Sequence, residues 1–133
     1  MSHRWILAIF VAAIAACSDR FVPAPLPEGA VPFGAPPIYQ TWWAQVEQCS
    51  GHRAPFSRVR WFAVPNADSF IAEGRRDNGV WIEHYRYIVL GESRIGDSLV
   101  VRHEMLHDLS GNLGHPAEYF RQKCGGVVQP AFE

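Results

Sequence analysis

The sequence predicts a small α+β domain at residues 38–133, preceded by an export segment and a linker. One observation is the order of its patterns: a helix-like stretch, several strand-like stretches, a second helix-like stretch, a loop and a last helix-like stretch. A second is composition, because 48% apolar residues, with five Trp and eight Phe, are ample for a folded core in a chain of 133 residues. A third is length, because a chain of 133 residues is expected to form one compact domain.

The first half of the domain is expected to hold one helix and the strands. Apolar residues recur at helical spacing over Tyr39–Cys49, and Gly51 suits the end of this helix. We expect its aromatic face to pack into the core. Strand composition follows in three stretches, namely Val59–Val64, Phe70–Ala72 and Val80–Leu90. The last stretch is either one strand or two strands broken near Glu83-His84, and residues 74–79 and 91–96 are expected to form turns or loops.

The second half is expected to hold two helices. Apolar residues and two histidines follow at helical spacing from Leu99 to His107, with Asp97 or Gly96 as the cap and Gly111-Asn112 as the end. Pro116 suits the first position of a last helix, which we expect over Pro116–Lys123.

The N-terminus has the pattern of an export segment. Residues 1–16 hold a basic residue, Arg4, followed by an unbroken apolar run, which is typical of a secretory signal peptide. The run is shorter than the roughly 20 residues that a membrane-spanning helix needs. It ends Ile14-Ala15-Ala16-Cys17, which resembles the lipobox of bacterial lipoproteins. The resemblance implies that Cys17 is lipidated; the alternative is an ordinary signal peptide with an incidental cysteine.

The residues after this cysteine predict a tether in the bacterial cell envelope. Ser18 follows the cysteine and, by resemblance to enterobacterial sorting, implies an outer-membrane anchor that faces the periplasm. Residues 19–37 contain six prolines and two glycines without periodicity, so residues 17–37 are expected to form a lipidated, semi-rigid tether. The expected membrane contact is therefore through the lipid.

The remaining cysteines favour a disulfide, and the charges exclude nucleic acid as an expected partner. Cys49 and Cys124 form an even pair in an exported domain, which favours one disulfide; the alternative is a metal role for Cys124, which follows the histidines. Twelve Lys and Arg against thirteen Asp and Glu give a net charge of −1, and Arg75-Arg76 is the densest basic pair. Nucleic acid is therefore not an expected partner, because it needs a concentrated basic surface.

The chemistry-bearing motif is His103-Glu104-Met105-Leu106-His107. Histidines four residues apart share one face of a helix, so both imidazoles can reach one cation. Glu104 projects beside that cation, where it can take a proton from an activated water and pass it to a leaving amine. Imidazole suits Zn²⁺, and an open position on the metal can hold the water.

This motif resembles the HExxH motif of the zincin metallopeptidases. The resemblance implies that the motif helix lies behind a small mixed sheet whose edge strand receives the substrate as an added strand. It also implies zinc as the cofactor, a peptide or protein as the substrate, and Glu104 as the general base. The resemblance covers residues 97–116, with a looser agreement in the order of the elements before them.

The third metal ligand is expected to be His115, with Glu118 as the alternative. His115 follows the turn-rich stretch at residues 110–114, which can return the chain to the helix, although a capping role next to Pro116 remains open. The metzincin branch takes its third histidine two residues earlier and has a methionine turn, whereas this chain has no methionine after Met105. The gluzincin branch takes a glutamate from a later helix, and Glu118 is the nearest candidate.

Four further residues are weaker candidates. Tyr119 can either donate to an oxyanion or pack beside its neighbours, and packing is the preferred interpretation. Asp108 can either orient His107 or be a solvated carboxylate, and solvation is preferred because consecutive helical residues diverge. His84 and Tyr85 are unranked candidates on the expected substrate strand.

Two functions follow from these patterns. The first is a zinc-dependent peptidase, in which Glu104 activates a water held by the metal of His103, His107 and His115. The alternative is an envelope lipoprotein that binds zinc without catalysis and acts as a structural or interaction module. Neither a Gly-x-Ser-x-Gly motif nor a phosphate-binding glycine loop offers a rival catalytic set.

Overall fold

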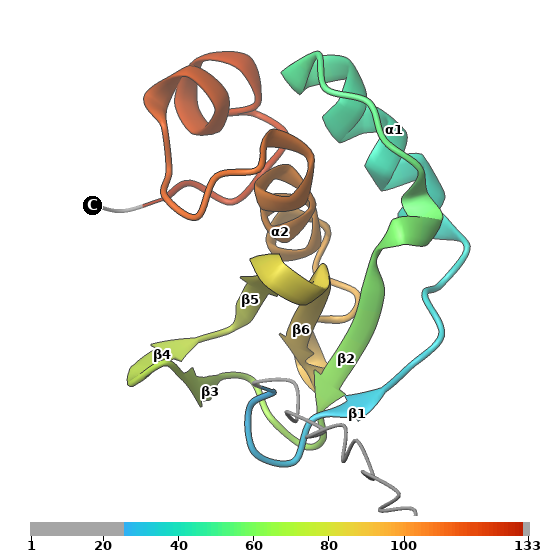
Figure 1. The fold of residues 1–133 in the computed structure, drawn as a ribbon, viewed down its shortest axis with the longest axis vertical. Helices are drawn as coiled ribbons and strands as arrows, with labels where there is room; N and C mark the ends of the chain where they lie inside the picture. The colour runs from blue at the N-terminus through green and yellow to red at the C-terminus, as the bar shows by residue number, and fades with distance from the viewer. Residues whose placement is uncertain (1–25, 132–133) are drawn as a thin grey trace, which may run out of the picture.

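The computed structural model describes residues 26–131, which form two layers, with helices on one side of a small sheet (Figure 1). Two 13-residue helices, α1 (Ile38–Ser50) and α2 (Ser98–Ser110), pack against each other, and α2 also packs on the sheet. Short helical turns η1 (Phe56–Arg58), η2 (Glu83–Tyr85) and η3 (Glu92–Arg94) connect the elements, and the wide turn η4 (Glu118–Lys123) packs on both helices. The predicted α+β class is confirmed.

The main sheet has four strands in the order β1-β2-β6-β5 and is mixed. Its strands are β1 (Val31–Pro32), β2 (Arg60–Val64), β5 (Gly79–Ile82) and β6 (Tyr87–Gly91). The central pair β2 and β6 is parallel, while β1 and β5 run antiparallel to their neighbours. A two-stranded antiparallel sheet, β3 (Phe70–Ala72) and β4 (Arg75–Asp77), projects from it. Of the two alternatives for residues 80–90, the structure has two strands, β5 and β6, separated near Glu83-His84 by η2.

Alternation along the strands divides the apolar residues between two clusters. Trp61, Trp81, Ile88 and Leu90 face the helices and join the main core, which also contains the aromatic face of α1 and the apolar face of α2. Val89 faces the other way and joins a second cluster with residues of the β3–β4 hairpin. Both faces of the sheet are therefore covered, which explains why β6 is buried along most of its length.

The ends of the two long helices follow their local chemistry. Asp97 caps α2, since its carboxylate accepts hydrogen bonds from the backbone N–H groups of Leu99 and Val100. Gly51 and Gly111 end α1 and α2 in the left-handed conformation, with φ of 77° and 68°. Of the two expected caps for α2, the structure therefore uses Asp97.

One expected turn contains a strand, and the expected last helix is shorter than predicted. Residues 74–79 were expected to form a turn, but Arg75–Asp77 is strand β4. Glu73 and Gly74 both have positive φ (49° and 75°) and form the two-residue loop that closes the β3–β4 hairpin. The expected last helix, Pro116–Lys123, is shortened to a π-helical turn over Glu118–Lys123. Strand β4 has a charged sequence with no strand-like composition, which explains why the sequence pattern missed it.

Part of the expected tether lies on the domain. Val31 and Pro32 pair with β2, and Phe33 makes edge contacts with Tyr39 and Trp61 in the main core. Leu26 and Ala30 pack against the second cluster. Leu26, Ala30 and Phe33 are partly buried against these clusters, which explains the difference from the expected boundary at residue 38. The predicted signal peptide at residues 1–16 and the lipidation site Cys17 lie outside the described residues. Within residues 26–131, no helix has the length and apolar character needed to cross a membrane.

The predicted disulfide is present. Cys49 and Cys124 are joined with an S–S distance of 2.02 Å across 75 residues of chain. The bond connects the last turn of α1 to the residue that follows η4. Because both sulfurs are in this bond, the alternative metal role for Cys124 is wrong.

Candidate metal centre

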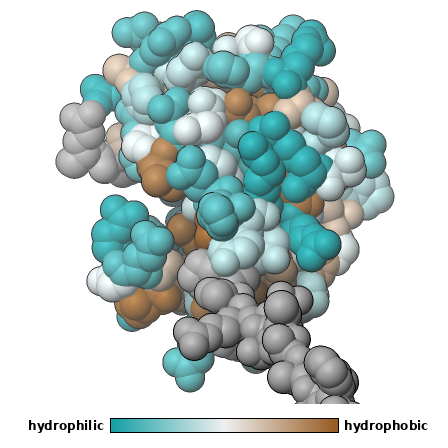
Figure 2. All heavy atoms as spheres, viewed as in Figure 1, coloured by the Kyte–Doolittle hydropathy of each residue, from teal (hydrophilic) through white to brown (hydrophobic). Residues whose placement is uncertain are grey.

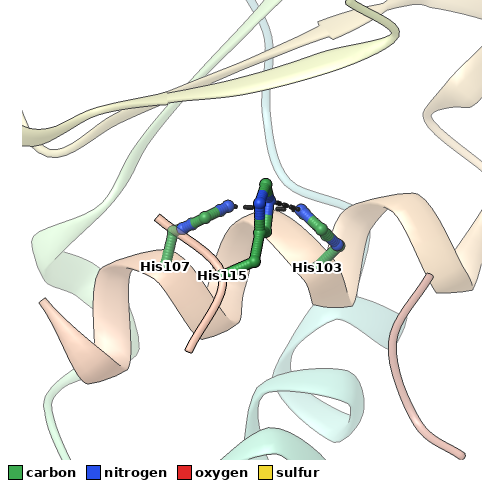
Figure 3. Close-up of side chains that lie close together, drawn as sticks. All are labelled: His103, His107 and His115. Carbon is green, nitrogen blue, oxygen red and sulfur yellow. Dashed lines mark hydrogen bonds between the residues drawn. The ribbon is translucent and has the colours of Figure 1, made fainter. Parts of the chain in front are cut away.

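Three histidine side chains converge on one point beside α2 (Figure 3). His103 and His107 lie on one face of the helix, and their Nε2 atoms are 3.2 Å apart. Gly111 ends the helix, and the following turn brings His115 back, so that its Nε2 lies 3.1 Å from that of His103. The ligand atoms of all three lie within 4.8 Å of one another, a spacing at which they can hold one metal ion.

The spacing fits a tetrahedral ion. Two nitrogens bound at about 2.05 Å to one tetrahedral Zn²⁺ lie roughly 3.3 Å apart, close to the nitrogen–nitrogen distances found here. His103 and His107 are largely buried, whereas His115 is exposed and closes the cluster from the solvent side. The donor set is three imidazoles, which suits zinc and also other late first-row metals.

Hydrogen bonds on the opposite side of two rings fix their tautomers. Nδ1 of His103 lies 2.8 Å from the backbone oxygen of Gln129, and Nδ1 of His107 lies 2.6 Å from that of Asn112. A carbonyl oxygen only accepts, so each Nδ1 carries the proton, and in the neutral ring Nε2 is left with a lone pair. Two lone pairs that face each other at 3.2 Å repel unless a cation lies between them. This arrangement favours metal binding over a histidine–histidine hydrogen bond.

Burial keeps these two imidazoles in the ligand form. Desolvation lowers the pKa of His103 to about 4 and that of His107 to about 3, and the neighbouring histidines contribute in the same direction. Both rings are therefore neutral at pH 7, as metal ligation requires. Phe120 of η4 supports the three rings, with ring centroids 4.8 to 4.9 Å away.

Glu104 lies between α2 and the edge strand β5. Its side chain is only 5% exposed and accepts a hydrogen bond from the backbone N–H of Trp81. It also passes close to Gly79, where a Cβ atom would lie 3.1 Å from both Cγ and Oε1 of Glu104. Burial, and then the charge of Asp77, raise the pKa of Glu104 to about 8. A cation held by the three histidines acts in the opposite direction, because it favours the charged carboxylate.

The histidines and Glu104 line one cavity of about 390 Å³. Its other walls come from β5, from the β3–β4 hairpin and from η2, which contributes His84. Leu113, 66% exposed, lies at its border. In Figure 2 the surface is indented on the side where the hairpin projects. The candidate centre is therefore accessible to a ligand larger than water.

The weaker sequence candidates lie elsewhere or have different surroundings. Glu118 is exposed, pairs with Lys123 at 2.8 Å and is not part of the cluster, so the structure brings His115 and not Glu118 to the other histidines. The Tyr119 hydroxyl lies 2.9 Å from Nε2 of His52, and Tyr119 does not line the cavity, which agrees with the packing interpretation. Tyr85 packs against Tyr87 and also lies outside the cavity lining.

The preferred interpretation of Asp108 was wrong. It is not solvated but 1% exposed, and its carboxylate accepts hydrogen bonds from Arg58, Trp81 and Arg86. Three donors from outside the helix compensate the cost of burying this charge. Sequence reasoning also missed Trp81 and Phe120, and a helical motif carries no signal for partners that come from a strand or from a later turn.

Comparison of the chain with protein-family models, with curated proteins and with solved structures gives no match. The interpretation of the centre therefore rests on its geometry and chemistry.

Proposed function

We propose that this chain is a zinc-dependent peptidase with a zincin-like active site. The observation that carries the proposal is that one cavity is lined both by the three convergent histidines and by the carboxylate of Glu104. A purely structural metal site is closed by its protein ligands, whereas a catalytic one combines three ligands with an open position. Here the described residues offer three ligands, and the cavity leaves room for a fourth group.

Glu104 is the proposed general base. When zinc is bound, it lowers the pKa of a water molecule and polarises the carbonyl of the scissile bond. Glu104 accepts the proton of the attacking water and donates it to the leaving amine. Its position is fixed on two sides, by the N–H group of Trp81 and by the close backbone at Gly79, so the carboxylate has little freedom to turn away.

An extended peptide is the substrate class that best fits the walls of the cavity. Strand β5 is at the edge of the sheet and lies along the cavity, so its outer edge can accept one further strand. The N–H of Trp81 points to Glu104, away from β6, and its carbonyl points to the same side. That carbonyl is a suitable acceptor for a backbone N–H of the substrate. Edge strand, mixed sheet and motif helix together support the zincin-like fold that the motif implies.

The proposed location is the bacterial cell envelope, with a lipid anchor on Cys17 in the outer membrane and the domain facing the periplasm. The lipobox-like sequence supports this location, and the Cys49–Cys124 disulfide is compatible with an oxidising compartment. Peptides or proteins of the envelope are then the accessible substrates.

The first test is metal content and peptide hydrolysis of the full chain beside Glu104→Gln and Glu118→Gln. Wild-type protein should hold one zinc per chain and cleave members of a mixed peptide library. Glu104→Gln should keep the zinc and lose hydrolysis, because the amide cannot take the proton. Glu118→Gln, matched in chemistry but outside the cavity, should retain both. Turnover in Glu104→Gln would contradict the proposal, and zinc without turnover in wild type would favour the non-catalytic zinc-binding lipoprotein.

A further inference from the structure

Trp81 contacts both a proposed metal ligand, His107, and the proposed general base, Glu104. Its ring is parallel to that of His107, with an interplanar angle of 4° and a centroid distance of 6.3 Å. Its backbone N–H donates to Glu104, the residue that follows the first histidine. The residue is 5% exposed, because its ring packs between the sheet and α2. Trp81 also lines the cavity. One strand residue therefore contacts a metal ligand and the proposed base at once.

Asp108 in turn holds Trp81. The indole Nε1–H donates to Oδ1 of Asp108 at 3.0 Å, and this hydrogen bond is buried. The same carboxylate receives Arg86 at 3.1 Å on Oδ1, and Arg58 at 2.7 Å on Oδ2. Arg58 also donates to the backbone oxygen of Asp108 at 2.8 Å. With donors on both oxygens, the carboxylate has one well-defined orientation, and the indole has one position relative to it.

Arg86 extends this connection to the other end of β5. It follows η2 in the left-handed conformation, with φ of 52°, which is unfavourable for a residue with a side chain. Its side chain returns to Asp108, so the carboxylate fixes one residue within β5 and one in the turn that follows it. A single buried acid on the motif helix thereby sets the position of the strand beside the metal centre.

We propose that Asp108 and Trp81 are positioning residues of the metal centre: Asp108 holds the indole, and the indole holds the His107 ring while the Trp81 backbone holds Glu104. The effect on His107 rests only on the histidine centre, whereas the effect on Glu104 also rests on the proposed function. Groups that orient a metal ligand from behind typically change metal affinity by about 10- to 100-fold. An acid that only stabilised the fold would change unfolding without changing the affinity of the folded protein.

A double-mutant cycle on the full chain separates these roles, with zinc affinity measured by chelator competition and stability by urea unfolding. Trp81→Phe keeps an aromatic ring beside His107 and the backbone N–H, and removes the indole donor. Asp108→Leu keeps a similar volume and removes the acceptor of the indole hydrogen bond. Each should weaken zinc binding about tenfold. The double variant should be no weaker than either single variant, because both act through one hydrogen bond.

Two results would overturn the proposal, and a control variant separates zinc affinity from stability. Unchanged zinc affinity in the single variants, with lower stability, would overturn the proposal, as would a hundredfold, additive loss in the double variant. Trp43→Phe is the control: it removes an indole hydrogen bond, to the backbone oxygen of Ala54, outside the cavity, and should lower stability with zinc affinity unchanged. An equal loss of affinity in this control would show that affinity simply follows stability. If Asp108→Leu does not fold, Trp81→Phe decides alone. Zinc affinity is measured without a peptide, so failure to find hydrolysis leaves this test intact.

Discussion

Helices α1 and α2 have the same length but very different surroundings. Each has 13 residues and ends at a left-handed glycine. In α1, the buried positions form one stripe, which contains Tyr39, Trp43, Val46 and Ser50, and the remaining positions are exposed or half-buried. This is the ordinary pattern of a helix that packs one face on a core.

In α2, nearly the whole second half of the helix is buried, with apolar side chains on one side and polar or charged side chains on the other. Val100, Val101, Met105, Leu106 and Leu109 pack in the core, while His103, Glu104, His107 and Asp108 are buried on the side of β5 and the cavity. Burial of polar side chains destabilises a fold unless each one has a partner. The concentration of such groups on one helix therefore supports the functional role proposed for α2.

The largest expected effect is the loss of metal binding in His107→Ala. Removal of one of three convergent ligands should abolish tight zinc binding, measured as metal per chain after dialysis. Zinc at a thousand times its dissociation constant stabilises a folded protein by about 4 kcal/mol, and this gain should disappear in the variant. His115→Ala should behave in the same way.

His52→Ala is the matched control, because His52 follows α1 and bonds Tyr119 outside the cavity. It should keep one zinc per chain. Loss of zinc in this control, or retention in His107→Ala, would remove the contrast between the two helices.

Trp43→Ala should show the opposite behaviour. Trp43 is 3% exposed, donates its indole N–H to the backbone oxygen of Ala54 and makes an edge contact with Phe56. Truncation of such a residue should lower the free energy of unfolding by about 3–4 kcal/mol. Zinc affinity of the folded protein should stay unchanged, since Trp43 does not line the cavity. Urea unfolding and chelator competition measure the two quantities, and a large loss of affinity would argue that α1 also shapes the centre.

The stability of the metal-free protein should have a maximum near pH 6.5. The pKa of Glu104 is raised to about 8 in the folded state, so between pH 8 and 6.5 the folded protein binds more protons, and stability increases as the pH falls. Below pH 6.5 the unfolded chain protonates both histidines while the folded chain does not, because their folded pKa values are about 3 and 4. Two histidines outweigh one glutamate, so stability then decreases.

On each side of this maximum, the free energy of unfolding is expected to decrease by on the order of 2 kcal/mol. Urea unfolding in the presence of a chelator, at several pH values, measures it. Glu104→Gln should remove the increase between pH 8 and 6.5 and leave the decrease below pH 6.5. A wild-type profile that rises steadily from pH 6.5 to 8 would contradict the assignment.

The difference between the helices also explains what the sequence could predict. Helical spacing predicted both helices, and the His-Glu-x-x-His spacing alone was enough to place two imidazoles on one face. His115 was predicted because a glycine turn returns the chain towards the helix. Trp81 and Phe120 could not be predicted as neighbours of the centre, since their contacts depend on how a strand and a later turn pack on α2.

Asp108 shows most clearly what helical spacing could not predict. Spacing on the helix correctly indicated that its side chain diverges from His107, but it could not indicate that two arginines and an indole meet the carboxylate there. Likewise, the prolines of residues 19–37 indicated an extended chain, and an extended chain can either leave the domain or add to its sheet, as β1 does. In both cases the missing information is which distant residues come into contact.

The smallest expected effects come from substitutions of two glycines. Gly51 has a backbone conformation that favours glycine, whereas Gly79 has a close neighbour that leaves little room for a side chain. Gly51 ends α1 with φ of 77° and has no atom within 4 Å of an added Cβ, so Gly51→Ala should lower the free energy of unfolding by about 1 kcal/mol and leave peptide hydrolysis unchanged. Gly79 in β5 has no positive φ, but an added Cβ would lie 3.1 Å from Glu104. Gly79→Ala should therefore lower kcat about tenfold, with zinc content unchanged and unfolding affected by less than about 1 kcal/mol. A Gly79→Ala variant with full kcat would mean that Glu104 adapts without loss, and that the backbone of β5 does not set the position of the base.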